Sequence, residues 1–240
     1  MSLKPDYQNR KQEVQSHLDF IKEVESFTIK SQLKSVTILQ QNILKASFFI
    51  HLYGLIESTL ALCILEVENK INNHHISDFS TFRICIQKLW IKHYFQLNNA
   101  NNKLEKRIDI THKAYTNALD TNSLFELKIK EKLRTVDNNT FDAVAKILDL
   151  RLNIPKNIRD IIINNNRYDG KNTLELIRTK RDKLAHGELS YSDVGNYTYA
   201  DLKSLFNEVC TYLDYVVEAF EKYISEEGYK LKEDVSEEEQ

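Results

Sequence analysis

The residues best suited to chemistry in this 240-residue chain are two arginines, an aspartate and a histidine within one helical pattern. Between residues 172 and 191 the sequence reads NTLELIRTKRDKLAHGELSY. At about 100° per residue, Leu174, Ile177, Leu184 and Ala185 share one face, and Arg181 falls in the middle of that face. Arg178, Asp182 and His186 occupy the adjoining arc. A guanidinium among core-facing residues is costly unless it is paired or faces a cleft, so these four side chains are candidate site residues.

Ordinary helix capping explains part of this pattern. Basic side chains near a helix C-terminus complement the helix dipole, and a following glycine suits the left-handed position that closes a helix. Capping accounts for Lys183, His186 and Gly187, but it does not account for Arg181 on the apolar face. The residues alone therefore leave two interpretations, a capped structural helix and a helix that carries a site.

The run RDKLAH, from Arg181 to His186, resembles the signature of the HEPN superfamily of ribonucleases. In that signature an arginine and a polar residue are followed by a few variable positions and a histidine. The run RDKLAHG, with small and polar residues after it up to Tyr191, is similar to stand-alone bacterial HEPN proteins of defence and toxin–antitoxin systems. The resemblance is sharp over residues 172–191 and diffuse over residues 43–70 and 197–225.

The resemblance implies an all-α, HEPN-like helical bundle that acts as a metal-independent endoribonuclease on RNA. His186 would transfer protons, Arg181 would hold a phosphate through two donors, and Asp182 would orient one of the two. The family often has asparagine where this chain has Asp182. One motif supplies one histidine, and HEPN nucleases typically place two motifs across a dimer interface, so a homodimer with a composite cleft is expected. An antitoxin protein is a further candidate partner.

An alternative from a different class is a non-catalytic helical HEPN module that binds a nucleotide or a partner protein. The intact pair of Arg181 and His186 favours the enzyme, whereas a net charge of −2 favours the binding module. No cofactor is expected, because the sequence contains no glycine-rich phosphate loop. No metal is expected either, because no carboxylate cluster is suited to Mg²⁺.

Residues 43–71 form the most hydrophobic segment, with apolar residues all round the helical wheel. Such a helix is either a central core helix or a membrane span. Glu57 at its centre argues against a span, so we expect a core helix and no membrane partner. A lone carboxylate on a core helix needs a partner, and Arg178 and Arg181 are the candidates, because the two helices pack together in HEPN-like folds. We expect a buried ion pair that fixes the packing, rather than a catalytic Glu57.

The composition favours long helices with short polar loops. The chain has only five glycines and two prolines, and turn-rich strand architectures need many more. We expect a single helical domain over residues 1–225, with residues 79–165 as a helical insertion, and an acidic, disordered tail over residues 226–240. Core helices are predicted at 43–71, 172–186 and 199–224. Further helices are predicted at 14–27, 79–95, 104–119, 124–133, 141–150 and 155–163.

Three smaller features bear on function. The aromatic and basic segment 79–95 fits RNA contact, but an amphipathic helix with buried aromatics is the favoured interpretation. The pair His74 and His75 near Asp78 could suggest a metal, but adjacent histidines on a loop are more often exposed. Three widely spaced cysteines among apolar neighbours indicate reduced thiols, and the polar N-terminus has no signal peptide, so a cytoplasmic protein is expected.

Overall fold

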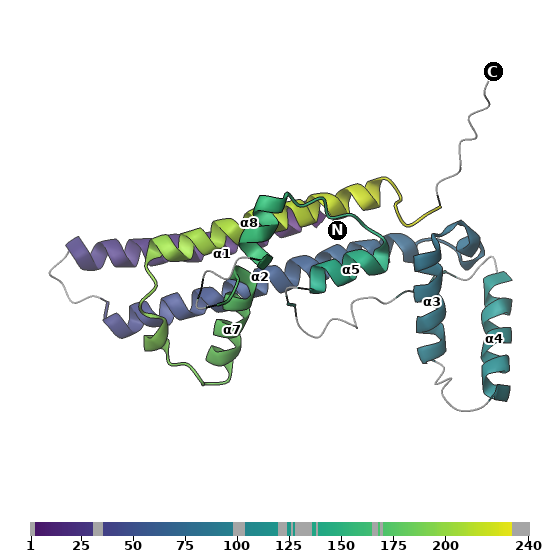
Figure 1. The fold of residues 1–240 in the computed structure, drawn as a ribbon, viewed down its shortest axis with the longest axis horizontal. Coiled ribbons are helices and arrows are strands. Elements are labelled where there is room, and N and C mark those ends of the chain that lie inside the picture. The colour runs from purple at the N-terminus through teal and green to yellow at the C-terminus, as the bar shows by residue number, and fades with distance from the viewer. Residues whose placement is uncertain are drawn as a thin grey trace, which may run out of the picture.

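Three long helices form the body of the computed structural model: α1 (Leu3–Lys30), α2 (Ile38–Asn72) and α8 (Tyr199–Ser225). They pack against one another along much of their length, and α1 lies antiparallel to α2 (Figure 1). The structure describes residues 3–30, 36–97, 104–119, 124–125, 127, 136–137, 139–164, 168 and 170–231. No β-strand occurs within these ranges, so the prediction of an all-α fold is confirmed.

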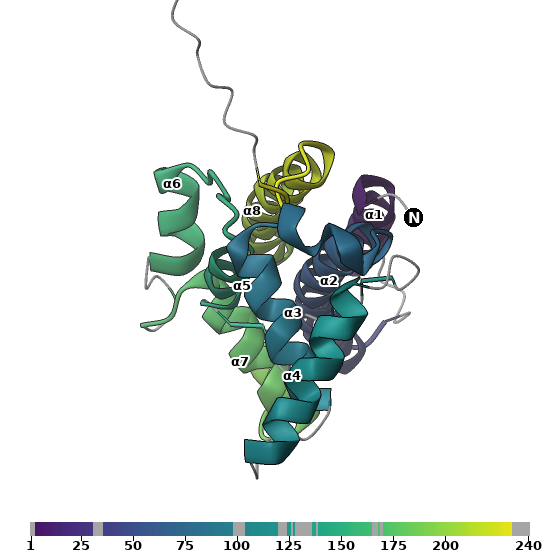
Figure 2. The ribbon, with the colours of Figure 1, turned by 90° about the vertical axis from the view of Figure 1, so that its right-hand side faces the viewer.

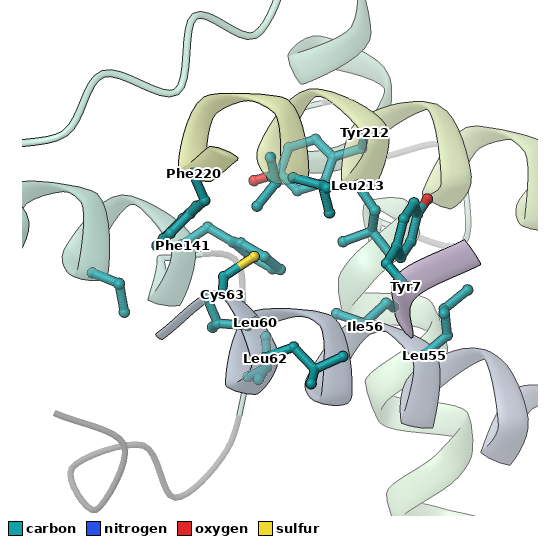
Figure 3. Packing of buried hydrophobic residues seen from close by; sticks show 14 of the residues in the cluster. Tyr7, Leu55, Ile56, Leu60, Leu62, Cys63, Phe141, Tyr212, Leu213 and Phe220 are labelled. Atoms are coloured by element: carbon teal, nitrogen blue, oxygen red, sulfur yellow. The ribbon is translucent and has the colours of Figure 1, made fainter. Parts of the chain in front are cut away.

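The hydrophobic core lies around α2, because that helix presents apolar side chains on nearly all sides. Leu60 and Cys63 of α2 are fully buried, and Figure 3 shows them facing aromatic residues of neighbouring helices. Phe141, from α5 (Thr140–Leu148), meets the ring of Tyr212 of α8 edge to face, with 5.3 Å between the ring centroids. Burying such aromatic side chains is a large favourable contribution to folding.

By length and composition, α2 is the one helix of the described residues that could cross a membrane. Its apolar window is 61% buried within the fold, which is the pattern of a core helix. The predicted helix over residues 43–71 is therefore present, and it is longer at its N-terminal end.

Local sequence sets where the long helices begin. At the start of α2, the Thr37 hydroxyl accepts a hydrogen bond from the Gln40 N–H, and the Gln40 side chain accepts one from the Thr37 N–H. Thr198 and Asp201 form the same reciprocal arrangement at the start of α8. Such capping boxes satisfy backbone donors that have no partner within the helix.

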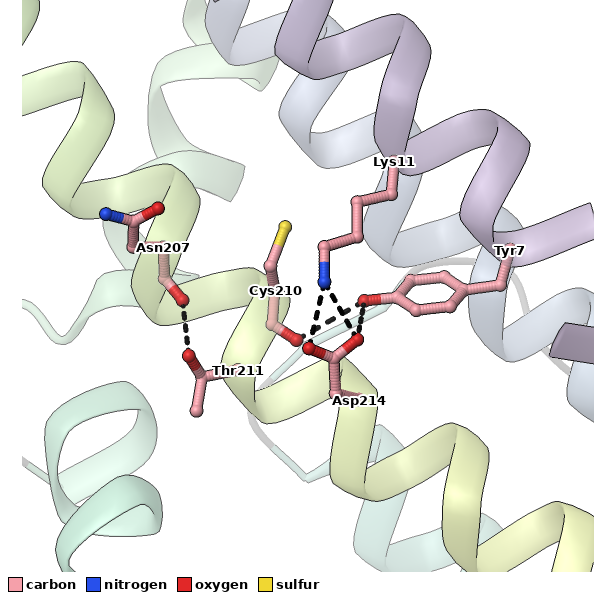
Figure 4. Close-up of polar contacts among 6 residues, drawn as sticks. All are labelled: Tyr7, Lys11, Asn207, Cys210, Thr211 and Asp214. Carbon is pink, nitrogen blue, oxygen red and sulfur yellow. Dashed lines mark hydrogen bonds and ion pairs between the residues drawn. The ribbon is translucent and has the colours of Figure 1, made fainter. Parts of the chain in front are cut away.

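A polar cluster fixes α1 to α8. The Tyr7 hydroxyl donates a 2.8 Å hydrogen bond to the Asp214 carboxylate, and the Lys11 ammonium pairs with the same carboxylate at 2.9 Å (Figure 4). Burial, together with the hydrogen bond to Asp214, raises the pKa of Tyr7, so its hydroxyl stays a donor. Because Leu3 and Tyr7 are buried, the first helix starts well before the predicted residue 14.

Several helices lie in the segment between the core helices, within its described residues, and they differ in how they pack. Helices α3 (Ile84–Leu97) and α4 (Leu104–Leu119) project away from the long helices (Figure 1). By contrast, α5 packs into the core, beside α8 in the end-on view of Figure 2. The short α6 (Lys156–Arg159) continues into a π-helical turn, η3 (Asp160–Asn164), and both contact α8.

Two predicted helices in this segment need correction. The helix predicted over residues 79–95 is interrupted, because η1 (Ile76–Thr81) ends before Phe82, whose backbone is extended and whose ring is buried. The helix predicted over residues 124–133 does not begin at Leu124, which instead forms a bridge with His75, and Phe125 is buried beside Phe82. Residues 128–133 lie outside the described residues.

The first residues of the predicted disordered tail, 226–231, have a defined structure. Residues 226–231 follow α8 and return to the body, where the Leu231 N–H donates to the Thr81 carbonyl and the Tyr229 carbonyl accepts from the Arg83 N–H. Tyr229 is buried, because its ring packs against His74 and Phe82. An aromatic residue in a glutamate-rich stretch thus keeps this part ordered. Residues 232–240 lie outside the described residues.

Candidate functional site

The candidate site is built on α7 (Thr173–Ala185), which crosses α2 (Figure 1). The Asn172 side chain caps this helix by accepting from the Glu175 N–H at 2.9 Å, and its amide donates to the Ile163 carbonyl at 2.8 Å. The Thr173 hydroxyl donates to the Glu208 carboxylate of α8 at 2.9 Å. Ile177 is fully buried, so the helix that carries the motif is fixed at both its start and its middle.

Arg181 lies where α7 meets α2, and its surroundings explain why an arginine occupies an apolar face. Its guanidinium carbon lies 4.2 Å from the centroid of the Tyr53 ring, and its Nη1 donates to an Asp182 oxygen at 2.7 Å. Its Nη2 lies 3.9 Å from a Glu57 oxygen, and 29% of the side chain remains exposed. The charge is therefore stacked and paired, and part of it stays accessible to solvent.

Glu57 pairs with the motif helix as predicted, but it is not buried. Its side chain is 44% exposed, and the 3.9 Å contact to Arg181 is a loose ion pair. The expectation of a buried Glu57 was wrong, because α1 and α8 cover other sides of α2 and leave this face open at Glu57. The ion pair of Glu57 is with Arg181 and not with Arg178, the other candidate partner, among the described residues. The Thr140 hydroxyl lowers the pKa of Asp137 most, and the charge of Arg178 contributes to the same shift.

Tyr53 is the residue of the candidate site that the sequence analysis did not identify. Its ring is almost completely buried beneath Arg181, and its hydroxyl oxygen accepts a hydrogen bond from the Val136 N–H at 3.2 Å. Burial raises the pKa of Tyr53, so the phenol stays neutral. The sequence did contain a clue to Tyr53, because Tyr53 and Glu57 are four residues apart and therefore share one face of α2.

His186 closes α7 and is exposed. The next residue, Gly187, has φ +71°, and its N–H bonds the Leu184 carbonyl, while the Glu188 N–H bonds the Lys183 carbonyl. These bonds form a Schellman motif, and the left-handed position of Gly187 that the sequence predicted is confirmed. The His186 imidazole forms no hydrogen bond within the described ranges, so it is free to meet a ligand. Asp182 orients Arg181 rather than His186.

The other candidates do not form a site in the described part of the chain. His74 lies 3.8 Å from Asp78, but its ring packs between Phe82 and Tyr229, and no group of three or more potential ligands is placed to hold a metal ion within the described ranges. Trp90 of α3 is buried against Phe79 and Phe125, so the core interpretation of that segment is favoured.

The cysteines are not placed for catalysis. Cys63 and Cys210 are buried free thiols, and Cys85 is partly buried. Burial raises the pKa of the Cys210 thiol to about 12, and it raises the pKa of Cys63 as well. A neutral, buried thiol is a poor nucleophile, so these residues serve packing.

The fold and the motif helix agree with a comparison to known families. A family model described as RiboL-PSP-HEPN matches residues 5–222, which is nearly the whole chain. The chain therefore belongs to the RiboL-PSP-HEPN family, whose domain is of the HEPN type. No curated protein and no solved structure matches the chain.

Proposed function

We propose that this HEPN-type protein is a metal-independent endoribonuclease that cleaves RNA by attack of the 2′-hydroxyl on the adjacent phosphate. The observation that carries the proposal is the placement of Arg181, which is stacked on Tyr53 and still accessible, on the helix that ends at an exposed His186. Such cleavage needs a cation near the phosphorane and groups that accept and donate a proton. Arg181 supplies the cation and His186 the proton transfer.

A second copy of the chain would complete this chemistry. One histidine cannot easily remove the 2′-hydroxyl proton and protonate the leaving 5′-oxygen at the same time. Five residues also rotate an α-helix by about 140°, so Arg181 and His186 of one chain leave α7 in different directions. We therefore propose a homodimer in which two motifs share one cleft. Sedimentation should find a dimer at micromolar concentration, and an active monomer would refute this assembly.

RNA cleavage in EDTA tests the activity itself. The wild type should cut single-stranded RNA without divalent ions, and the products should carry 2′,3′-cyclic phosphate ends. DNA of the same sequence should stay intact, because it lacks the attacking hydroxyl. A requirement for Mg²⁺, or cleavage of DNA, would contradict the mechanism.

One observation favours the non-catalytic alternative. Both Asp182 and Glu57 lie beside Arg181, and two carboxylates around one guanidinium oppose the approach of a phosphate. A non-catalytic HEPN module, which binds a nucleotide or a partner protein and need not hold a phosphate at Arg181, would tolerate this arrangement. Binding of RNA or of a partner without any cleavage, under the conditions above, would identify this alternative.

The biological setting that we propose is that of a toxin or antiphage effector in the cytoplasm, with an antitoxin protein as its regulator. The resemblance of the RDKLAHG run to stand-alone defence proteins supports this proposal. Induced expression should arrest bacterial growth, and His186→Ala should relieve the arrest. Equal arrest by both proteins would contradict a toxic ribonuclease activity.

A further inference from the structure

A groove lies between α1 and α2 and is lined by residues of both helices. Its volume is about 470 Å³, and we call it the α1–α2 groove. The residues that line it include a guanidinium, two imidazoles, a carboxylate, a hydroxyl and a glycine: Arg10, His17, His51, Glu13, Ser58 and Gly54. None of these residues belongs to the candidate site on α7.

The α1–α2 groove and the candidate site both include residues of the same stretch of α2. Gly54 precedes Glu57 by three residues, which is a rise of about 4.5 Å and a rotation of about 60° between the two positions. Both residues are accessible to solvent. His51 lies six residues before Glu57, about 9 Å along the helix axis. A strand held at Arg181 can therefore reach the groove within a short length.

The side chains of the groove offer the contacts that a nucleotide needs. Arg10 is exposed and has no ion-pair partner among the described residues, so its guanidinium can meet a phosphate. His51 presents an exposed ring 4.8 Å from the ring of His17, and such a ring can stack on a base. The Glu13 carboxylate can accept a hydrogen bond from the exocyclic amino group of cytosine.

Gly54 keeps the groove open. A Cβ atom built at Gly54 meets no atom within 4 Å, so packing does not require a glycine at this position. Its backbone is helical, and glycine is disfavoured inside helices relative to residues such as leucine. The absence of a side chain at Gly54 thus costs helix propensity and leaves space in the groove.

We infer that the α1–α2 groove binds a nucleotide of single-stranded RNA that flanks the cleaved phosphate. This inference rests on the proposed function, because the cleaved phosphate is placed at Arg181. Arg10 contacts the flanking phosphate, His51 stacks on the base, and Glu13 accepts from its amino group. The groove positions RNA, so it contributes to binding rather than to the chemical step.

The inference is tested with a short 2′-O-methyl oligocytidine, which binds but cannot be cleaved because its 2′-oxygen is blocked. Its dissociation constant is measured by fluorescence anisotropy for the wild type, Gly54→Leu and Arg10→Gln. Each variant should bind about tenfold more weakly, which is the scale of one lost stacking or charged contact. Gly54→Leu should keep the melting temperature of the wild type or raise it, because the site has space for the new side chain.

Arg151→Gln is the matched control, because Arg151 is exposed and lies after α5, outside the groove. It removes the same charge and should leave binding unchanged. The inference is overturned if the wild type does not bind the oligonucleotide, if Gly54→Leu and Arg10→Gln bind as the wild type does, or if Arg151→Gln weakens binding equally.

Cleavage of ordinary RNA separates this inference from the proposed function. With cleavable substrate, Gly54→Leu should raise KM by about tenfold and leave kcat nearly unchanged. If the wild type cleaves RNA and Gly54→Leu has the same KM and kcat, the inferred nucleotide site in the groove is wrong and the proposed ribonuclease activity stands. If the wild type binds RNA through the groove but never cleaves it, the proposed ribonuclease activity is wrong and the nucleotide site in the groove stands.

Discussion

The guanidinium carbon of Arg181 lies 4.2 Å from the centroid of the Tyr53 ring, so the central charge of the motif helix rests on an aromatic surface of α2. This contact joins the two helices on which the proposed site depends. It also explains why Arg181 occupies the apolar face of the motif helix. An arginine that stacks on a buried tyrosine can occupy such a face without a buried, unpaired charge.

Replacing Arg181 by lysine should distinguish the effect of the positive charge on cleavage from the effect of the planar guanidinium geometry. Lysine keeps the positive charge but loses the planar stack on Tyr53 and the fork of donors that holds a phosphate. We expect Arg181→Lys to cleave RNA about 10²-fold more slowly, the scale of losing one oriented transition-state donor. Tyr53→Phe, which keeps the ring, serves as the comparison and should retain most activity. Full activity in Arg181→Lys would show that the geometry is unimportant.

The Glu57 ion pair should contribute little to stability. Because the Glu57 side chain is 44% exposed and 3.9 Å from Arg181, the pair resembles a surface ion pair, worth roughly 0–1 kcal/mol. Glu57→Gln should therefore lower the free energy of unfolding by less than about 1 kcal/mol in a denaturant titration. A loss of about 3–5 kcal/mol, typical of breaking a buried pair, would show that Glu57 is desolvated in solution.

His17 should make the fold less stable in mild acid. Burial lowers the pKa of His17 below its ordinary value of 6.5, and its Nε2 lies 3.1 Å from the Leu44 carbonyl oxygen. The unfolded chain then binds more protons than the folded chain between the lowered pKa and about 6.5, so stability falls as the pH drops through that window. Above about pH 7 both states are neutral at this site, and His17 adds no pH dependence.

Melting temperatures measured from pH 8 to pH 5 test whether stability falls as the pH drops. His17→Gln should lose less stability than the wild type as the pH falls, because glutamine does not titrate. His75→Gln removes an exposed histidine instead and should follow the wild type. Parallel curves for His17→Gln and the wild type would exclude His17 as a source of the acid sensitivity.

Much of the fold follows from periodicity, since the long apolar patterns predicted the core helices of residues 43–71, 172–186 and 199–224. The sequence failed where tertiary contacts decide the structure. The break before Phe82 and the order at Tyr229 both depend on aromatic rings from distant segments that pack together. Periodicity within one segment contains no information about such partners.

The candidate site was predicted only in part, and the missing part also depends on contacts between distant segments. Arg181, Asp182 and His186 belong to one helical pattern, so their spacing could be identified from the sequence. The exposure of Glu57 and the burial of Tyr53 depend on which faces of α2 the other helices cover, and a wheel with apolar residues all round does not specify this. The α1–α2 groove was likewise invisible, because α1 and α2 contribute its residues jointly.

Cleavage of RNA by His186→Ala is the most direct test of the proposed ribonuclease. The rate should fall by about 10²–10⁴-fold in EDTA, the usual contribution of a proton-transfer group. The melting temperature should stay nearly unchanged, because His186 is exposed at the end of α7. His75→Ala, which alters another exposed histidine, should cleave at the wild-type rate. Cleavage by His186→Ala at the wild-type rate would contradict the account.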